Sequence, residues 1–283
     1  MSDTARRSER CPVALGVVVY NPGATLVQRL EAAIEDGVSV FLFDNSPDSD
    51  TTRNFAASRR ESCHYSTCGK NLGLGIGISS VCANAFYSGY RALVFFDQDT
   101  VFDTRTLRFV EHFYRQQSGL ELQHSAVVFN AKEGSSDAFE ASALHPVDVA
   151  ISSGTLFYLS NLKRLNWHND TYFVDGVDYE FCLASRRHGY RIAEYRKTPG
   201  FDHSSEQPDS ILQLFGRAHP VRRYSVGRIF DTVQATSRLA LTALFAGQLR
   251  FFALMVRSLA IYGAFQVVAR FLKRKQTSHP VSR

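Results

Sequence analysis

The chain alternates between short apolar runs and longer segments in which apolar residues recur at helical spacing. Residues 13–19 (VALGVVV) and 38–43 (VSVFLF) are continuous apolar runs rich in β-branched residues, a pattern typical of strands buried on both faces of a parallel sheet. Between them, residues 25–36 place apolar side chains on one helical face. The three segments together predict a βαβ unit.

The same alternation continues to about residue 195. Apolar residues share one face of a helix predicted over residues 77–90, which leads into a buried strand over residues 92–96. The pattern after residue 100 predicts further elements of an α+β arrangement: helices over 107–117 and 176–188, and strands over 125–130, 150–159 and 191–195. The expected fold is α/β, with a Rossmann-like, mostly parallel central sheet flanked by helices.

Composition narrows the class of protein. The chain has 283 residues, of which 45% are hydrophobic and 12% aromatic, enough to bury one full core and unlike a disordered or collagen-like chain. Its five cysteines form no CxxC pair, which argues against a disulfide framework or a zinc site and favours a reducing compartment. The polar residues 1–12 lack the apolar segment of a signal peptide and are predicted to be disordered.

Charge divides the chain into two parts. Residues 217–283 hold 12 of the 32 Lys and Arg but only one acid, Asp231, so this segment carries +11 and the rest of the chain carries −6. A nucleic-acid binder would spread basic charge over its folded domain, so no nucleic-acid partner is expected. A basic segment rich in Phe, Leu and Ala instead suits an anionic membrane surface.

The basic segment, taken as residues 216–283, is predicted to form an amphipathic helical appendage. Its uncharged stretches, residues 239–249 and 258–269, are shorter than the roughly 18 residues that a spanning helix needs. Arg238, Arg250, Arg257 and Arg270 fall within an arc of roughly 160° on one helical wheel, which predicts a helix lying in the plane of the membrane. The alternative is a helix packed on the body of the protein or on a second subunit, and a homo-oligomer is left open. The expected location is cytoplasmic, at the inner face of the cell membrane.

The main candidate for chemistry is the segment Phe95-Phe96-Asp97-Gln98-Asp99-Thr100 at the end of a predicted buried strand. On an extended backbone, Asp97 and Asp99 would point to the same side, at the carboxyl edge of the sheet where ligands bind. Two carboxylates there would hold Mg²⁺ or Mn²⁺ and so neutralise a diphosphate. The simpler interpretation of such a pair is a solvated turn.

Two further motifs support a nucleotide site. Asp44-Asn45-Ser46 ends the second strand, and residues 71–77 (NLGLGIG) lead into a helix whose N-terminal amides would face an anion. A dinucleotide cofactor is excluded, because the first strand is followed by Tyr20-Asn21-Pro22-Gly23 rather than GxGxxG.

Together these motifs resemble the family 2 inverting glycosyltransferases, which have the GT-A fold, and more narrowly the bacterial rhamnosyltransferases of O-antigen and related polysaccharides. The resemblance extends from about residue 13 to about residue 230. It rests on six motifs: VVVYNP (17–22), DNS (44–46), NLGLGIG (71–77), FFDQDT (95–100), ISSGTLF (151–157) and DGVDYEFCLASRRHGY (175–190). It implies a catalytic domain over residues 13–215, with a nucleotide-binding half (13–100) and an acceptor-binding half (101–215).

The resemblance also implies roles for individual residues. The nucleotide-sugar would contact Tyr20, Asp44, Asn45, Asn71, Gly73, Gly77, Asp97 and Gln98. The metal would be held by Asp97, Asp99 and His203, although a lone histidine such as His203 is as readily structural. The acceptor or its phosphate would contact Ser153, Gly154, Arg222, Arg223 and Tyr224, the last three being equally a charge cluster that faces the membrane.

An inverting transfer needs a base for the acceptor hydroxyl, and the acidic motif assigns this role to Asp178, with Glu180 and Asp175 as catalytic neighbours. The same residues would suit a helix start, with Asp175 as N-cap and Asp178 at the N3 position. Both roles are compatible.

The resemblance thus implies a metal-dependent transferase that moves L-rhamnose from dTDP-rhamnose to a lipid-linked saccharide or polysaccharide acceptor. Another donor, such as UDP-galactofuranose or a UDP-hexose, is the first alternative. A nucleotidyltransferase would need a glycine-rich, basic loop after the first strand, where residues 20–30 contain only Arg29. A non-catalytic nucleotide-sugar-binding protein would not need Asp178.

Overall fold

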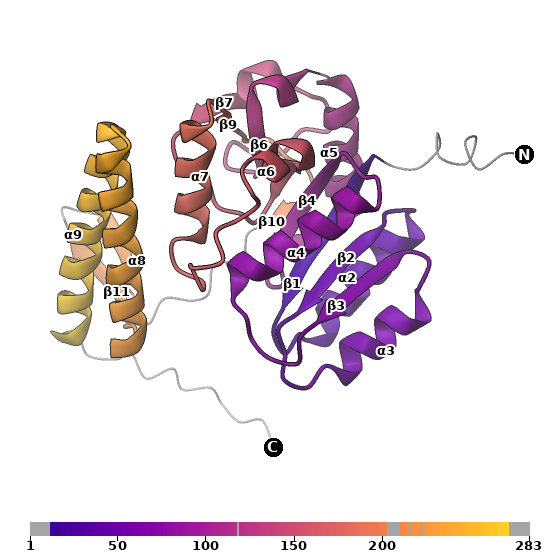
Figure 1. Ribbon diagram of the computed structural model, residues 1–283, viewed down its shortest axis with the longest axis horizontal. Coiled ribbons are helices and arrows are strands. Elements are labelled where there is room, and N and C mark those ends of the chain that lie inside the picture. Colours follow the sequence, from indigo (N-terminus) through magenta and orange to yellow (C-terminus); the bar gives the residue numbers. More distant parts are fainter. Residues whose placement is uncertain (1–11, 118, 203–209, 215–216, 222, 272–283) are drawn as a thin grey trace, which may run out of the picture. The chain divides into compact units, whose positions relative to one another are not determined.

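The computed structural model describes residues 12–117, 119–202, 210–214, 217–221 and 223–271 (Figure 1). The predicted disordered segment 1–12 therefore lies, except for Pro12, outside the described residues. The chain divides into two compact units, Met1–Ser204 and Ser205–Arg283. The sequence analysis starts the C-terminal appendage at residue 216, whereas the second unit starts at Ser205.

An eight-stranded sheet organises the first unit, with the strand order β3-β2-β1-β4-β8-β6-β9-β7. The pairs β1–β2, β2–β3, β1–β4 and β6–β9 are parallel, whereas β8 runs antiparallel to β4 and β6, and β7 runs antiparallel to β9. The strands are β1 (Val13–Val19), β2 (Val40–Asp44), β3 (Cys63–Thr67), β4 (Ala92–Asp97), β6 (His124–Phe129), β7 (Leu144–Val147), β8 (Thr155–Tyr158) and β9 (Arg191–Tyr195). The α/β fold with a mostly parallel sheet is confirmed.

Helices cover both faces of this sheet, so its central strands carry apolar side chains in both directions. Leu15 and Val17 belong to a core cluster with Leu30 of α2 and Val110 of α5. Alternate residues of β1 face the other side of the sheet, where Val18 packs against Gly77 of α4. A Cβ added to Gly77 would lie 2.7 Å from the Val18 side chain. The helices are α2 (Ala24–Glu35), α3 (Asp50–Ser58), α4 (Leu74–Tyr87), α5 (Thr104–Gln116), α6 (Leu159–Arg164) and α7 (Val177–Arg187).

The helix boundaries follow local capping chemistry. α4 begins three residues before the predicted start, at Leu74, because Gly73 adopts a positive φ of 88° and serves as its N-cap. α5 begins at Thr104 rather than at residue 107, because the Asp103 side chain accepts a hydrogen bond from the backbone N–H of Thr106 and closes a capping box. α7 ends at Arg187, just before the predicted end, and Gly189 follows with φ of 81°.

One predicted strand is too long. Only Thr155–Tyr158 of residues 150–159 form β8, because Gly154 adopts φ of 77° ahead of it and Leu159 already begins α6. α3, β3, α6, β7 and the short pair β5 (Val101–Phe102) with β10 (Phe201–Asp202) have no counterpart in the sequence analysis. Most of these elements are short or lie at a sheet edge, so their sequences are too short or too polar to show a clear hydrophobic pattern.

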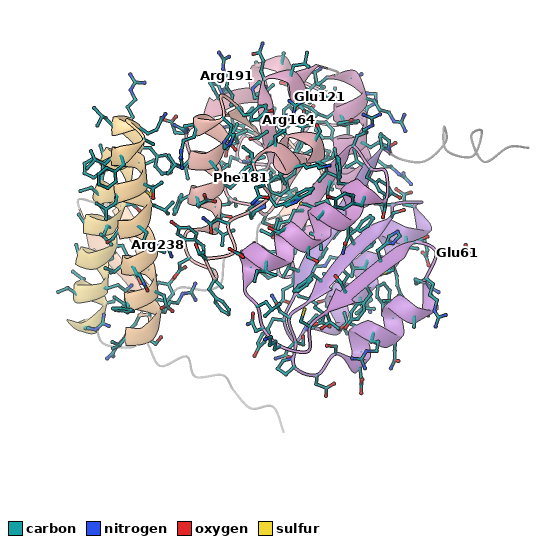
Figure 2. The ribbon with its side chains drawn as sticks, viewed as in Figure 1. Glu61, Glu121, Arg164, Phe181, Arg191 and Arg238 are labelled. Atoms are coloured by element: carbon teal, nitrogen blue, oxygen red, sulfur yellow. The ribbon has the colours of Figure 1, made fainter. Side chains whose placement is uncertain are left out.

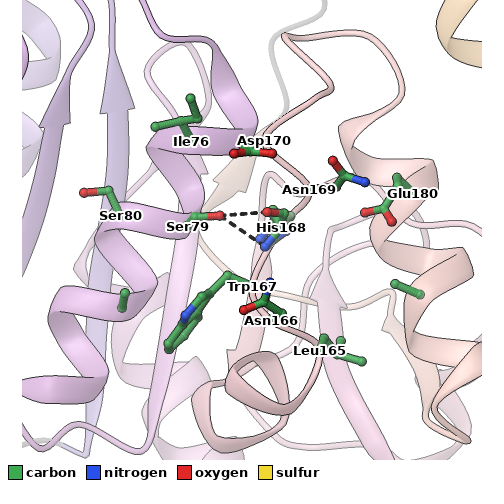
Figure 3. A pocket seen from close by; sticks show the side chains of 12 residues that line it. Ile76, Ser79, Ser80, Leu165, Asn166, Trp167, His168, Asn169, Asp170 and Glu180 are labelled. Atoms are coloured by element: carbon green, nitrogen blue, oxygen red, sulfur yellow. Dashed lines mark hydrogen bonds between the residues drawn. The ribbon is translucent and has the colours of Figure 1, made fainter.

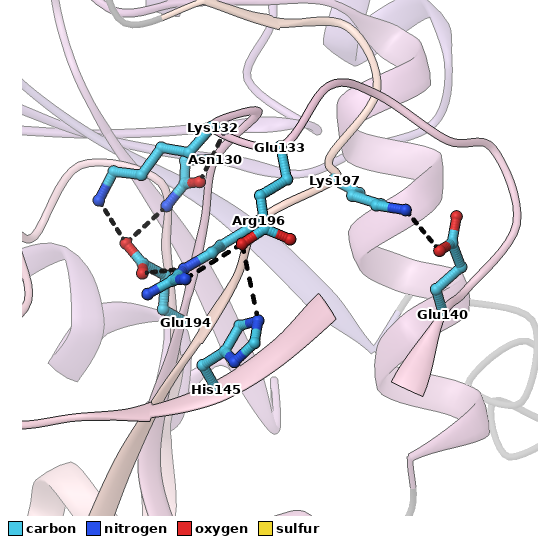
Figure 4. Close-up of polar contacts among 8 residues, drawn as sticks. All are labelled: Asn130, Lys132, Glu133, Glu140, His145, Glu194, Arg196 and Lys197. Atoms are coloured by element: carbon cyan, nitrogen blue, oxygen red, sulfur yellow. Dashed lines mark hydrogen bonds and ion pairs between the residues drawn. The ribbon is translucent and has the colours of Figure 1, made fainter. Parts of the chain in front are cut away.

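Most charged side chains lie at the surface, and one buried carboxylate outside the carboxyl edge of the sheet is paired with cations. Glu61, Arg164 and Arg191 lie at the surface, whereas Phe181 of α7 is buried (Figure 2). Glu194 of β9 is 7% exposed, and its carboxylate accepts hydrogen bonds from Lys132, Arg196 and Asn130 (Figure 4). Desolvation raises the pKa of Glu194, but these partners lower it by more. The network therefore has a structural role at this end of the sheet.

The second unit holds a β-hairpin and two helices. β11 (Ser210–Leu214) pairs antiparallel with β12 (Arg217–Val221), and α8 (Val226–Phe245) packs against α9 (Leu249–Phe271). The predicted single helix, with Arg238 and Arg270 on one arc, is wrong. Arg238 belongs to α8 and Arg270 to α9, and the helical structure is interrupted between Phe245 and Leu249. Over Leu249–Arg270, α9 is long and apolar enough to cross a membrane, judged by length and composition alone.

Candidate active site at the carboxyl edge of the sheet

The parallel strands β1, β2 and β4 end side by side, which gathers the polar residues that follow them. Val19 pairs with Asp44, and Val18 pairs with Asp97. Beyond β1, the Tyr20 backbone N–H donates to Gln98 Oε1 at 2.8 Å, and Gln98 Nε2 donates to the Tyr20 carbonyl at 3.2 Å. Gln98 thus joins the chain after β1 to the chain after β4, and the Tyr20 side chain stays 46% exposed at this edge.

The segment after β4 is a turn rather than a continued strand. β4 ends at Asp97, and the Thr100 backbone N–H donates to the Asp97 carbonyl at 3.2 Å. The alternation that would point Asp97 and Asp99 to one side of an extended strand is therefore absent. Arg29 of α2 fixes the turn, because its guanidinium donates to the carbonyls of Gln98 and Thr100.

Two consecutive serines connect Asp97 to Asp178. The Asp97 backbone N–H donates to Ser153 Oγ at 3.0 Å, and Ser153 Oγ lies 2.6 Å from Thr100 Oγ1. Ser152 donates to Asp178 Oδ1 from both its backbone N–H, at 3.1 Å, and its hydroxyl. The loop before β8 thereby ties the start of α7 to the end of β4.

The carboxylates gathered here perturb one another. Desolvation, then the charges of Asp178 and Asp99, raise the pKa of Asp97 to about 7. Desolvation also raises the pKa of Asp178, although the two hydrogen bonds from Ser152 oppose the shift. Because like charges at short range disfavour ionisation, the proximity of these carboxylates favours a proton or a cation at the site. A cation or a proton-accepting role would suit it.

Two carboxylates are enough for the cation that the sequence analysis expects. Among the described residues, no group of three or more His, Cys, Asp or Glu side chains could hold a metal ion. Mg²⁺, however, keeps several waters and commonly takes one or two protein carboxylates together with substrate phosphates. Asp97 and Asp99, close enough for Asp99 to raise the pKa of Asp97, fit this mode. His203 lies outside the described residues.

Asp44 is fully buried at the end of β2, with its side chain already engaged. Its carboxylate accepts hydrogen bonds from the Ser46 backbone N–H at 2.8 Å, from Thr52 Oγ1 at 2.5 Å and from the Tyr65 hydroxyl at 3.4 Å. Because the carboxylate is fully buried, a nucleotide base would reach Asp44 only if one of these neighbouring groups moved. In this structure Asp44 shapes the wall of the site.

Asn45 holds the glycine-rich loop in place. Its Oδ1 accepts from the Leu72 backbone N–H at 2.9 Å, and its Nδ2 donates to the Gly73 carbonyl at 3.1 Å. Asn71 is exposed, and its Oδ1 accepts from the Gly73 backbone N–H at 2.9 Å. The loop is thus preorganised next to the ends of β1 and β2, and Asn71 lies on its exposed side.

The glycines of this loop allow close packing between chain segments. A Cβ on Gly73 would lie 2.5 Å from the Phe173 carbonyl oxygen, and one on Gly75 would lie 3.0 Å from two carbonyls of residues 169–172. The Leu74 backbone N–H donates to the Phe173 carbonyl at 2.6 Å, so this amide at the start of α4 is used within the protein rather than left for an anion. The glycines therefore join the nucleotide half to the segment before α7.

We expect Gly73→Ala to destabilise the fold by about 3–5 kcal/mol, because a side chain would be strained at φ 88°, ψ 171° and would collide with backbone. Gly69→Ala is the matched control: Gly69 also has positive φ (66°), but no atom lies within 4 Å of its added Cβ. Its expected loss is about 1 kcal/mol. Urea unfolding of both variants measures the difference, and equal losses would contradict the close approach of Phe173.

The start of α7 differs from the predicted capping arrangement. Gly176, with φ of 88°, is the N-cap, so Asp175 precedes the cap and Asp178 occupies the second helical position. Asp178 faces Ser152, whereas Glu180 bonds Asn169 on another side of the helix. Asp178 therefore lies close enough to Asp97 for their charges to interact, whereas Glu180 lies beside Asn169.

Glu180 faces a separate cavity of about 670 Å³ between α4, residues 165–170 and α7 (Figure 3). Desolvation raises the pKa of Glu180, and hydrogen bonds from Asn169 oppose the shift. Ser79 of α4 anchors the rim, because its hydroxyl donates to the His168 carbonyl at 3.2 Å and accepts from the His168 backbone N–H at 3.1 Å. This cavity has no counterpart in the sequence analysis.

The predicted acceptor residues are placed in part. Gly154 adopts φ of 77°, and its backbone N–H donates to the Phe95 carbonyl at 2.8 Å, which sets the loop beside β4. Arg222 lies outside the described residues, and Arg223 and Tyr224 belong to the second unit. Within that unit the Tyr224 ring stacks on Tyr262, and the Arg228 guanidinium lies 4.7 Å from the Tyr224 ring centre.

Sequence reasoning missed two supporting residues of the site. Arg29 was noted only as an isolated basic residue, since nothing local shows that it reaches the turn after β4. Ser152 lies inside the ISSGTLF motif, but only its hydrogen bonds to Asp178 reveal its role.

Solved structures of TarS from S. aureus share this architecture. The chain matches the TarS 1–349 structure over 82% of its own length at a TM-score of 0.55 and 14% identity, and it spans 65% of that chain. The same fragment in complex with UDP-GlcNAc matches at a TM-score of 0.58 and 14% identity, over 86% of this chain and 71% of that one. A longer TarS chain is covered over only 39% of its length. Neither protein-family models nor curated proteins match the chain. The likeness concerns the fold alone, and the chain has the GT-A fold.

Proposed function

We propose that the chain is an inverting glycosyltransferase that moves a sugar from a nucleotide diphosphate donor to a saccharide acceptor. One observation carries the proposal: Asp97, after a central parallel strand, and Asp178 of α7 are held at one site by the consecutive residues Ser153 and Ser152, which bond them. The first carboxylate lies at the edge where nucleotides bind in α/β sheets, and the second comes from the start of α7. The GT-A fold, shared with a TarS structure that contains UDP-GlcNAc, supports the same conclusion.

Asp178 would act as the general base. An inverting transfer is a single displacement, in which the acceptor hydroxyl attacks the anomeric carbon and gives up its proton while the nucleotide diphosphate leaves. A base works best when its pKa approaches the working pH. Desolvation raises the pKa of Asp178, and Ser152 fixes the orientation of the carboxylate through two hydrogen bonds.

On the donor side, Asp97 and Asp99 would hold Mg²⁺ or Mn²⁺, which would supply charge neutralisation to the departing diphosphate. Gln98 positions this pair by bonding the Tyr20 backbone, and Tyr20 offers an exposed ring for the donor. Asn71 would contact the nucleotide from the exposed side of its loop.

The donor we propose is dTDP-L-rhamnose, which inversion would turn into an α-rhamnoside. Its support is the resemblance of the sequence motifs to the rhamnosyltransferases. UDP-galactofuranose or a UDP-hexose is the alternative, favoured by the UDP-GlcNAc in the TarS structure. A nucleotidyltransferase is disfavoured further, because Arg29, the only basic residue between positions 20 and 30, is committed to two backbone carbonyls.

The acceptor we propose is a lipid-linked saccharide in cell-surface glycan synthesis, met at the cytoplasmic face of the membrane. The α8–α9 pair would attach the protein there. It exposes large apolar side chains, including Phe230, Phe245 and Leu249, and among its charged residues only Asp231 is acidic. Apolar and cationic groups together suit an anionic lipid surface.

A donor panel tests the function. With purified protein and Mg²⁺ or Mn²⁺, we expect dTDP-rhamnose to bind more tightly than other dTDP-, UDP- and GDP-sugars in calorimetry, and to be slowly hydrolysed. Tighter binding of a UDP-sugar would overturn the rhamnose assignment alone. Failure of every nucleotide sugar to bind would overturn the proposed function.

A further inference from the structure

The cavity between α4 and α7 has a lining whose chemistry is specific. Its polar groups are carboxylates, amides and hydroxyls, from Asp170, Glu180, Asn166, Asn169, Ser79 and Ser80. Trp167 contributes an aromatic ring to the same wall (Figure 3). The volume of about 670 Å³ is within the range of small-molecule sites.

The charge of the lining excludes an anionic ligand. None of the residues that line this cavity is Lys or Arg, whereas two are acids. A phosphate or nucleotide would meet Asp170 and Glu180, and Glu180 already interacts with the charge of Arg187. A neutral molecule with many hydroxyl groups would instead find both acceptors and donors, and an aromatic face for its C–H groups.

The backbone that presents Trp167 is held in an unusual conformation. Asn166 and Trp167 are consecutive non-glycine residues with positive φ, at 61° and 65°. Such strain persists where the surrounding structure enforces it and is concentrated at ligand sites. Here the two hydrogen bonds between Ser79 and the His168 backbone, and the contact of the Trp167 ring with Phe86 at 5.9 Å, hold the segment against α4.

Unsatisfied polar capacity lies in the same wall. His168 is 4% exposed, and neither of its ring nitrogens has a hydrogen-bond partner among the described residues. Its ring stacks on Phe181 at 5.0 Å, and burial lowers its pKa to about 3, so the imidazole is neutral. A neutral imidazole has one donor and one acceptor nitrogen, and both are covered by protein in this structure.

We propose that this cavity binds a neutral saccharide, with Trp167 as the stacking surface and Asn169 and Asp170 as hydroxyl-binding groups. The inference rests on the proposed function in one respect: the saccharide would be a non-reacting sugar of the acceptor. Glu180 at the cavity and Asp178 at the reaction site lie in the first turn of the same helix. The two side chains are two positions apart and lie on different faces of α7, so a saccharide held in the cavity would extend around the start of α7 to bring its terminal sugar to the base.

The chain itself supplies the probe, because Trp167 is its only tryptophan. The experiment titrates the full chain with methyl α-L-rhamnoside, with the methyl glycosides of glucose, galactose, mannose and N-acetylglucosamine, and with disaccharides of these sugars. We expect saturable quenching or a blue shift of the tryptophan emission by at least one of them. Donor binding is followed in parallel by calorimetry.

Two substitutions on adjacent residues of α4 make a matched pair. Ala83 lines the cavity, whereas Asn84 is exposed and does not. Ala83→Phe would fill the cavity and raise the saccharide dissociation constant at least about tenfold, while Asn84→Phe would change it less than about twofold. Asp170→Ala, at an exposed position, gives a second test that does not disturb packing, with an expected weakening of about threefold or more.

The outcomes separate the two proposals. No fluorescence response to any saccharide, with intact calorimetric binding of a nucleotide sugar, would overturn the saccharide cavity and leave the proposed function standing. A response that Ala83→Phe removes, without binding of any nucleotide sugar, would support the cavity and overturn the transferase. A response to the nucleotide sugar alone would overturn the cavity proposal, because it would assign this space to the donor.

Discussion

Replacing Asp178 by Asn is expected to slow sugar transfer by a factor of about 10²–10⁴, the range for loss of a general base, while the donor still binds. The amide is close in size to the carboxylate but cannot take the acceptor proton. Ser152 would keep its backbone donor facing the amide oxygen, so the start of α7 should stay in place.

The measurement compares initial rates of transfer with calorimetric donor affinity for the same preparation. Asp148→Asn is the control. Asp148 is an exposed acid whose carboxylate forms an ion pair with Arg186 of α7 at 2.9 Å, and it has no proposed role in the reaction. It should leave the rate within about twofold, as is usual for a surface ion pair. Unchanged transfer in the Asp178 variant would refute its role as base and favour a non-catalytic binding protein.

The Asp97→Asn variant should lose activity and gain stability at neutral pH. Loss of a cation ligand is expected to lower the transfer rate at least about a hundredfold, because metal stabilisation of a leaving group is worth several kcal/mol. The gain in stability arises because the amide is never charged, whereas the native carboxylate ionises in a desolvated site beside Asp178 and Asp99.

The sign of the pH dependence follows from the raised pKa. The folded protein holds the Asp97 proton up to a pH of about 7, whereas the unfolded chain releases it near 3.8. The folded state therefore binds more protons between these values, and its stability falls as the pH rises through that window. The total loss is on the order of 4 kcal/mol for a shift of this size. It should be absent from urea melts of Asp97→Asn.

A divalent cation should reverse this loss. At pH 8, excess Mg²⁺ or Mn²⁺ should stabilise the wild type by about 2–3 kcal/mol at a hundredfold excess over its dissociation constant, and a chelator should remove the effect. Asp48→Asn, at an exposed carboxylate after β2, should respond like the wild type. Equal cation effects on the wild type and Asp97→Asn would contradict a metal site at Asp97.

Much of the fold could be predicted because its signals are local. The apolar runs that became β1, β2 and β4, and the helical periods of α2, α4, α5 and α7, are each contained in one short stretch of sequence. β3 was not predicted, because its sequence, CHYST, is not an apolar run. This segment is a strand because Cys63–Thr67 pairs with Val40–Asp44 of β2. The local sequence alone does not predict that pairing.

The candidate site was predictable in its chemistry but not in its geometry. Asp97 and Asp178 were singled out as carboxylates at the ends of elements, yet their association depends on Ser152 and Ser153. In the same way, Gly73 was interpreted as part of an anion-binding loop, whereas its lack of a side chain admits the Phe173 carbonyl.

Hydrophobic period and residue type, which act over one or two turns of chain, were enough to predict the layer architecture, the order of the main elements and the carboxylates proposed for catalysis. The tertiary structure alone decided which polar groups meet: the turn after β4 that Arg29 fixes, the serine link to Asp178, and the cavity around Trp167. Such contacts join residues tens of positions apart. Their geometry depends on how the whole core packs, which no single segment encodes.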